Sequence, residues 1–210
     1  MNLFVLLFFL FVVLSTLLLG ANFIRREDSV FKSFGIALLL DSVAFILWSL
    51  GLIQPEKLAF YVTWGAIFFL ASLVFLSYVS IQKIQKAKNR YLLTIFSVVA
   101  AFGIFYVGMG RADAYISQEG LLFFNLWPIV QMLYIFGLMV AALPAINILA
   151  SKFKTPYSLL VSYGFMIEVI GGVILITNTD FYALNITGWI MGITYLALLT
   201  ILFSKKETVA

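Results

Sequence analysis

The chain has 210 residues, of which 64% are hydrophobic and 10% are charged, with a mean hydropathy of +1.12 and a formal charge of +4. Soluble domains contain roughly half apolar and a quarter charged residues, so this composition predicts an integral membrane protein. The chain has no histidine and no cysteine, which excludes disulfides, His- or Cys-dependent nucleophilic sites and the usual zinc and haem ligands. We therefore expect no enzymatic activity, no cofactor and no metal.

Apolar runs of about 20 residues, the length of a membrane-spanning helix, occur seven times and are joined by short connections. They predict an all-α fold, a bundle of seven transmembrane helices in a single domain, residues 1–210. The first run has no basic residues before it and exceeds the length of a signal-peptide core, so we expect a retained helix. The predicted helices cover about residues 2–24, 33–54, 58–81, 91–110, 124–150, 156–178 and 184–203.

The basic residues predict the orientation of the bundle. Eleven of the 13 lysines and arginines fall in alternate connections or in the C-terminal tail. By the positive-inside rule, the N-terminus is outside, the C-terminus is cytoplasmic, and the chain is a multi-pass protein of the cell membrane. Loops one and three are then cytoplasmic, and we expect loop three to contact an acidic protein partner or anionic lipid, not nucleic acid. The basic residues of loop three are Lys83, Lys86, Lys88 and Arg90.

Two acids lie within predicted spans, Asp41 on the second helix and Glu168 on the sixth. A carboxylate at bilayer depth costs at least about 3 kcal/mol, so we expect both to face the bundle interior as neutral acids. Asp41 is expected about a third of the way from the cytoplasmic end, and Glu168 near mid-depth. Each acid either serves a proton relay, cation site or ligand anchor, or bonds a backbone carbonyl or a Ser/Thr hydroxyl of a neighbouring helix.

Further candidates are polar or small residues inside the predicted helices. Some polar side chains either line a pocket between helices four, five and six, or are interhelical hydrogen-bonding or interfacial residues. Glycines near Glu168 and in a G-x-x-x-G pattern allow close approach of helices within the bundle or to a partner chain. The pocket candidates are Tyr106, Gln131, Tyr134 and Tyr163, and the packing glycines are Gly171, Gly172, Gly188 and Gly192.

The longest outside connection, residues 110–125, carries most of the polar residues on that face. It is either a lid or docking surface, or a solvated loop. Retinal chemistry needs a lysine on the seventh helix, and residues 184–203 contain none, so a retinal protein is excluded.

Two segments carry a resemblance to a known family: "LSTLLLGANFIRREDSVFKSFGIALLLDSVAFILWSLGL", from Leu14, and "TDFYALNITGWIMGITYLALLTILF", from Thr179. A glycine ends the first helix, a short basic loop follows, and the apolar second helix is led by Phe34 and closes with Trp48. This pattern resembles the seven-helix sensor region at the N-terminus of many bacterial and archaeal histidine kinases. No kinase follows Lys206, so the resemblance implies a stand-alone sensor or receptor-like bundle, or a membrane subunit that works through partners, and it supplies no catalytic residues.

The sequence thus predicts a receptor-like or sensory module that acts through protein partners in the membrane or at cytoplasmic loops one and three, with an unknown small-molecule ligand. One alternative is a structural or accessory subunit of a larger membrane complex, whose aromatic residues and G-x-x-x-G helix pack on neighbours. Another is a proton-linked small-solute transporter with Asp41 and Glu168 as the coupling acids.

Overall fold

The computed structural model describes residues 3–25, 27, 29–84, 113–116 and 122–125, together with single residues or pairs at 99, 103, 118, 128–129, 131–132, 135, 139, 166, 169–170, 173 and 193. The helices predicted after residue 90 lie outside the continuously described segments. The continuously described segments comprise the first three helices, the short turn between the second and third, and one hairpin.

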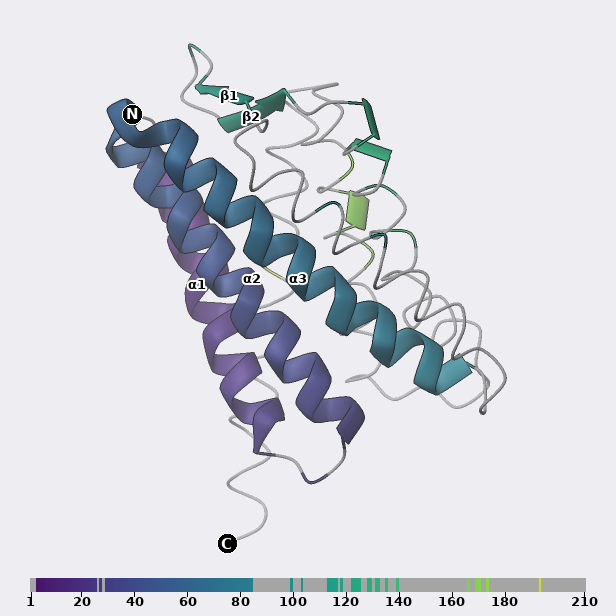
Figure 1. The fold of residues 1–210 in the computed structure, drawn as a ribbon. Helices are drawn as coiled ribbons and strands as arrows, with labels where there is room; N and C mark the ends of the chain where they lie inside the picture. The colour runs from purple at the N-terminus through teal and green to yellow at the C-terminus, as the bar shows by residue number, and fades with distance from the viewer. Residues whose placement is uncertain are drawn as a thin grey trace, which may run out of the picture.

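The first 84 residues form three helices in the places where the sequence predicts them: α1 (Leu3–Ile24), α2 (Ser29–Ile53) and α3 (Leu58–Ile84). A 3-10 turn, η1 (Pro55–Lys57), joins α2 to α3. Figure 1 shows the three helices lying side by side, with α2 in contact with both α1 and α3. Short connections make consecutive helices antiparallel. Because α2 contacts both α1 and α3, it is the central helix of this unit.

Two stretches are long and apolar enough to cross a membrane, Lys32–Ile53 and Pro55–Phe75, and α1 contributes the shorter apolar stretch Phe9–Ile24. The helices extend beyond the predicted limits, because α2 begins at Ser29 instead of 33 and α3 continues to Ile84 instead of 81. Hydropathy identifies only the apolar part of a helix, whereas the backbone is also helical in the more polar residues at its ends.

Aromatic rings connect the three helices in a continuous row. Phe9 of α1 lies 5.7 Å from Phe45 of α2, measured between ring centroids. Phe45 contacts Trp48 at 5.3 Å, edge to face, and Trp48 contacts Phe69 of α3 at 5.6 Å. All four side chains are at most 8% exposed, so this row forms much of the core that holds α1, α2 and α3 together.

A hairpin lies within the connection predicted as a loop. Strands β1 (Asp113–Ile116) and β2 (Leu122–Asn125) pair antiparallel, with Ile116 opposite Leu122. Residues 124 and 125, which the sequence places at the start of the fifth helix, belong to β2. Strand β1 contacts α3, and Leu122 is 2% exposed within the core, so the hairpin packs onto the helices. In Figure 1 it lies at the end of the bundle where α3 begins.

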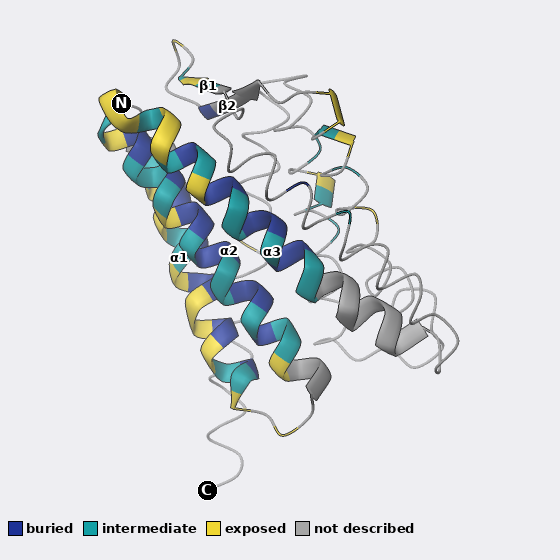
Figure 2. Cartoon of the chain, viewed as in Figure 1, coloured by how far each residue is buried: buried dark blue, intermediate teal, exposed yellow. Residues whose placement is uncertain are grey.

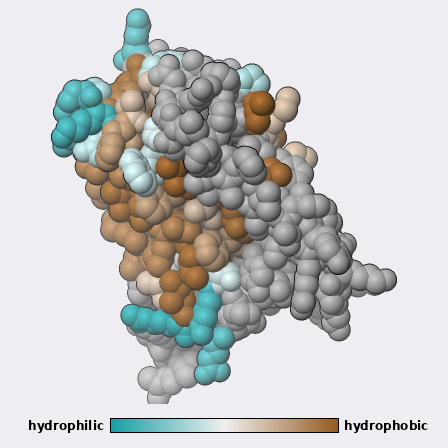
Figure 3. Space-filling view, in the orientation of Figure 1, coloured by the Kyte–Doolittle hydropathy of each residue, from teal (hydrophilic) through white to brown (hydrophobic). Residues whose placement is uncertain are grey.

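Polarity in the described helices is the reverse of that in a water-soluble bundle. The outer side of α1 carries exposed leucines, among them Leu10 and Leu14, which are 54% and 51% exposed (Figure 2). Its inner side carries the fully buried hydroxyls of Ser15 and Thr16. Figure 3 shows an apolar surface band with hydrophilic residues at its two ends. Burying hydroxyls while exposing leucines is favourable where the solvent is hydrocarbon.

Candidate functional site

Four polar side chains meet in the interior of the three-helix unit: Thr16 of α1, Asp41 and Ser42 of α2, and Ser72 of α3. We call them the polar cluster. Each is at most 1% exposed. Asp41 and Ser42 are consecutive on a helix, so their side chains point about 100° apart and reach different neighbours. This geometry allows one short segment of α2 to bind both flanking helices.

Asp41 is bound from α3. The Ser72 hydroxyl donates a short hydrogen bond to Oδ1 of Asp41. Asp41 has twelve helical residues on each side, because α2 runs from Ser29 to Ile53. It therefore lies halfway along α2. The expected depth of Asp41, about a third of the way from the cytoplasmic end of the membrane span, stays a prediction. Asp41 is thus an interior acid that accepts a hydrogen bond from a hydroxyl on a neighbouring helix. This is the arrangement expected if Asp41 holds two helices together.

Ser42 is bound from α1, its hydroxyl oxygen lying 2.7 Å from Oγ1 of Thr16. The same hydroxyls also lie 2.8 Å from carbonyl oxygens of their own helices, Leu38 for Ser42 and Val12 for Thr16. A hydroxyl has one hydrogen to donate. One member of the pair therefore donates across the helix interface and the other donates to its own carbonyl, so the α1–α2 contact is a true interhelical hydrogen bond.

Glycines bring the backbones of α1 and α2 together close to the polar cluster. An added Cβ at Gly35 would lie 2.8 Å from both the Gly20 carbonyl oxygen and the Ile24 backbone nitrogen. An added Cβ at Gly20 would lie 3.0 Å from the Gly35 carbonyl oxygen. The backbone contacts at Gly35 are shorter than a Cβ atom tolerates, and the one at Gly20 is at the limit. The crossing of α1 and α2 therefore requires glycine at position 35 and favours it at position 20.

A third glycine supports the α2–α3 contact. An added Cβ at Gly65 of α3 would lie 2.3 Å from Nε1 of Trp48, so the indole ring rests directly on the α3 backbone. Trp48 also contacts Phe45 and Phe69, as described above. The cluster is thus bordered on one side by a glycine crossing and on the other by an indole packed on glycine, which fixes the rotation of all three helices.

The chemistry available to the polar cluster is limited to hydrogen bonding and proton exchange by one carboxyl group and three hydroxyls. In the part of the chain that the structure describes, no group of three His, Cys, Asp or Glu side chains is placed to hold a metal ion. The arrangement ties α1, α2 and α3 together.

Most of the other predicted site residues lie outside the described residues. Gln131 is half-buried, and Lys83, predicted in loop three, has a helical backbone within α3. The remaining candidates, whose surroundings the structure does not describe, are Glu168, Tyr106, Tyr134, Tyr163, Gly171, Gly172, Gly188, Gly192, Lys86, Lys88 and Arg90.

Sequence reasoning missed Thr16, Ser42 and Ser72 as partners in the site. The available signal was the presence of hydroxyl residues within strongly apolar helices, where they seek partners on other helices. Comparison of the chain with protein-family models, with curated proteins and with solved structures finds no match. The site is therefore interpreted from its own geometry.

Proposed function

We propose that the chain is a non-enzymatic seven-helix module of the cell membrane, receptor-like or sensory, which passes a signal to a protein partner on the cytoplasmic side. In this proposal the N-terminus is outside and the C-terminus is cytoplasmic. The observation that supports it best is the position of α3. One end of this helix lies beside the hairpin, and the other carries Lys83 and leads into the basic residues 83–90.

The length of α3 suits a connection between the two sides of a membrane. Its 27 residues extend about 40 Å at 1.5 Å per residue, compared with about 30 Å for the hydrocarbon core of a bilayer. About 10 Å of helix is left to extend into the interfacial layers. A displacement of the hairpin at one end of α3 would therefore be carried along a continuous helix to the other end, which carries Lys83.

The contacts of the hairpin also support this role. Ala114 and Ile116 of β1 are half-buried against the hydrophobic core, and Leu122 of β2 is part of it. Tyr115, between the two inward residues, is 50% exposed. A hairpin with one face packed on the bundle and one aromatic side chain open to the outside is suited to respond to a ligand.

A structural subunit of a larger membrane complex is the second candidate. The exposed leucine side of α1, which includes Leu7, Leu10 and Leu14, gives such a subunit an apolar face on which neighbouring helices could pack. A transporter is less well supported, because Asp41 is enclosed and bonded to Ser72.

Site-directed photocrosslinking in membranes separates these functions. A photoreactive residue at position 86, on the basic segment, is compared with one at 57, at the opposite end, and one at 14, on the leucine side of α1. A sensor crosslinks a partner from position 86, and substituting the neighbouring Lys83, Lys88 and Arg90 by Gln abolishes the product. The quadruple Gln variant, which also replaces Lys86, serves for crosslinking from position 14. Substituting Lys57 by Gln is the matched control and should leave the product unchanged.

Two results would contradict the proposal. Crosslinking from position 14 to a partner that stays bound to the quadruple Gln variant would identify a structural subunit. Solute uptake by the purified chain in proteoliposomes, driven by a proton gradient and lost in Asp41→Asn or Glu168→Gln, would identify a transporter.

A further inference from the structure

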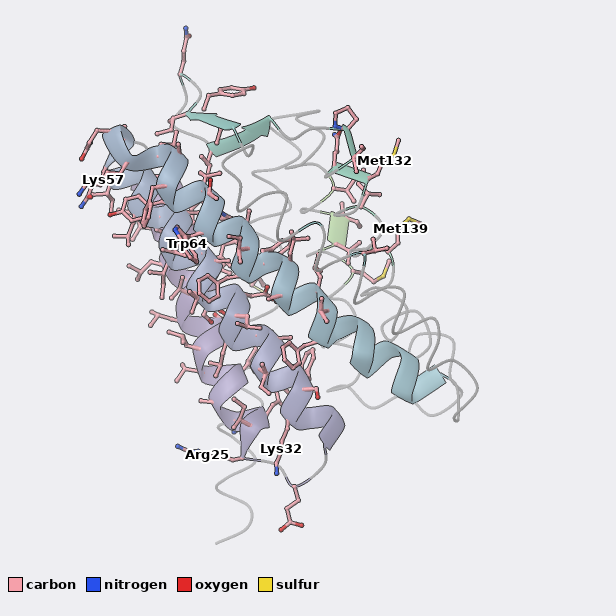
Figure 4. The ribbon with its side chains drawn as sticks, in the orientation of Figure 1. Arg25, Lys32, Lys57, Trp64, Met132 and Met139 are labelled. Carbon is pink, nitrogen blue, oxygen red and sulfur yellow. The ribbon has the colours of Figure 1, made fainter. Side chains whose placement is uncertain are left out.

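Basic residues gather at the end of the bundle where α1 ends and α2 begins. Arg25 and Lys32 are both exposed there (Figure 4), whereas Lys57 lies at the opposite end. Because α3 runs antiparallel to α2, its C-terminal residues belong to the same end as Arg25 and Lys32. We call this the basic end. Its described basic side chains are Arg25 and Lys32, and the backbone of α3 ends there at Ile84. In the sequence, Arg26 follows Arg25, and the basic residues Lys83, Lys86, Lys88 and Arg90 occur where α3 finishes and directly after it.

The charges of the two ends differ. At the basic end, loop one also contains Glu27, which is exposed, and Asp28, but residues 83–90 contain four basic side chains and no acid. At the opposite end of α2 and α3, Glu56 and Lys57 are adjacent and exposed, and their charges cancel. The basic end therefore has an excess of positive charge that the α2–α3 turn at the other end lacks.

Two of these positive charges lie directly against the apolar surface. Arg25 immediately follows the last residue of α1, Ile24, and Lys32 is the first residue of the apolar stretch Lys32–Ile53. Each charge is thus within about one helical turn, roughly 5 Å, of the part of the chain that hydrocarbon would cover. In a bilayer, that depth is occupied by lipid headgroups, and long Arg and Lys side chains reach the phosphates with their apolar stems still in contact with the acyl chains.

The charge of Lys32 is not explained by the stability of its helix. The residue lies in the first turn of α2, which contains no acidic residue. The positive end of the helix dipole is at that turn, where a lysine is unfavourable and an anion is favourable. Glu27 and Asp28 precede this turn and offset part of the charge of Arg25, Arg26 and Lys32, which leaves loop one with a net charge of +1 (three basic residues less two acids). An anion outside the protein, close to the surface of the membrane, would balance this remaining charge.

We propose that the basic end binds the headgroups of anionic phospholipids in the leaflet that surrounds it. This inference rests on the membrane placement in the proposed function but not on its signalling partner. For Arg25 and Lys32, anionic lipid fits better than an acidic protein, because both side chains are exposed, border the apolar band and are at headgroup depth. Residues 83–90, which the proposed function assigns to a partner protein, bind the same headgroups when no partner protein occupies them. Anionic leaflets attract basic residues located immediately beside a transmembrane helix in this way.

The test is native mass spectrometry of the purified full-length chain, released from nanodiscs that contain equal amounts of phosphatidylcholine and phosphatidylglycerol. The number of retained molecules of each lipid is counted. The wild type should retain phosphatidylglycerol in preference to phosphatidylcholine. The preference should fall about fivefold for each effective charge removed, in Arg25→Gln/Arg26→Gln/Lys32→Gln and in the quadruple Gln variant of residues 83–90. Lys57→Gln, at the opposite end, should behave as the wild type.

Equal retention of the two lipids by the wild type would overturn the proposal, as would an unchanged preference in both basic variants. The unfolding temperature of each variant in detergent identifies any variant that fails to fold. If one of the two basic variants fails, the lipid preference of the other decides the outcome. No partner protein is present in this experiment. A chain that prefers phosphatidylglycerol but crosslinks no partner from position 86 would leave the lipid site standing and remove the signalling role. A chain that crosslinks a partner through the basic residues but shows no lipid preference would assign the basic end to protein.

Discussion

Asp41 and Ser72 join α2 to α3 in the middle of the bundle through a hydrogen bond from the serine hydroxyl to the aspartic carboxyl group. The next residue, Ser42, joins the same segment of α2 to α1 through Thr16. Water does not compete for such groups in the hydrocarbon region, so removal of one partner leaves the other without its hydrogen bond. The central segment of α2 therefore fixes the positions of both α1 and α3 through hydrogen bonds.

Ser72→Ala should lower the free energy of unfolding by about 1–2 kcal/mol, because it removes the donor that α3 offers to Asp41. Asp41→Asn should have a smaller effect, since an amide oxygen still accepts from Ser72, and Asp41→Leu a larger one. Unfolding by SDS in mixed micelles measures these differences. Ser49→Ala is the control, since that hydroxyl donates to the Phe45 carbonyl of its own helix at 2.7 Å. Equal losses in Ser72→Ala and Ser49→Ala would show that the interhelical bond contributes nothing.

The Thr16–Ser42 pair should show a favourable coupling of about 0.6 kcal/mol, a typical value for interhelical hydrogen bonds in membranes. A double-mutant cycle of Thr16→Val and Ser42→Ala measures this coupling separately from the loss of each hydroxyl's own packing. The Thr16–Ser49 pair is the matched control, because Ser49 bonds within α2. Additive effects in the Thr16–Ser42 cycle would indicate that each hydroxyl bonds only to its own carbonyl.

Gly35→Ala should be strongly destabilising, by about 1–3 kcal/mol, because the new Cβ would lie 2.8 Å from backbone atoms of α1 that cannot rotate away. Gly51→Ala, on the same helix, is the matched control. Its Cβ would lie 3.0 Å from Cδ1 of Leu58, the flexible end of a side chain. Unfolding temperatures in detergent compare the two variants. A loss at Gly51 equal to that at Gly35 would mean that helix propensity, and not the close crossing, decides the outcome.

The first three helices could be predicted from the sequence because long apolar runs have few alternatives in a bilayer. Their facing sides were not predicted, because apolar residues surround α1 and its few hydroxyls, Ser15 and Thr16, were not recognised as marking the side that packs inward. The Gly20–Gly35 crossing and the Thr16–Ser42 pair depend on the rotation of each helix about its axis. That rotation is determined only when α1, α2 and α3 are packed together.

The site was predicted in part for the same reason. A carboxyl group such as Asp41 stands out in an apolar run and needs an interior partner, so its orientation follows from its desolvation cost. The identity of the partner, Ser72, requires the relative position of two helices, 31 residues apart in the chain. The hairpin was missed because a two-stranded ribbon of four-residue strands gains its stability from packing on the bundle, through residues such as Leu122.

Single-cysteine labelling should report the orientation directly, because the chain has no native cysteine. In intact cells, a membrane-impermeant maleimide should label Lys57→Cys, on the outside in the proposed topology. It should label Lys32→Cys only after the cells are permeabilised. Both positions are exposed in the structure, so neither is shielded by the chain itself. The reverse pattern would invert the topology and move the basic end to the outer leaflet.

Leu14→Asp distinguishes a membrane bundle from a water-soluble one by the sign of its effect. Leu14 lies near the middle of α1 and is 51% exposed. If the outer side of α1 faces lipid, the carboxylate costs about 2.5–3.5 kcal/mol of insertion free energy, and the variant should be depleted from the membrane fraction. If that side faced water, the same change would leave the fold intact and improve solubility.

Two further variants make this test specific. Leu14→Ala keeps the site apolar and should insert normally, because an exposed leucine loses little packing when it is shortened. Val12→Ala should insert normally but unfold more easily, since Val12 is fully buried in the hydrophobic core. The measurement is carbonate extraction of membranes followed by quantification of each variant in the pellet. Recovery of Leu14→Asp in the soluble fraction as a folded, monomeric protein would refute a transmembrane α1, because only a helix that leaves this side in water tolerates the charge.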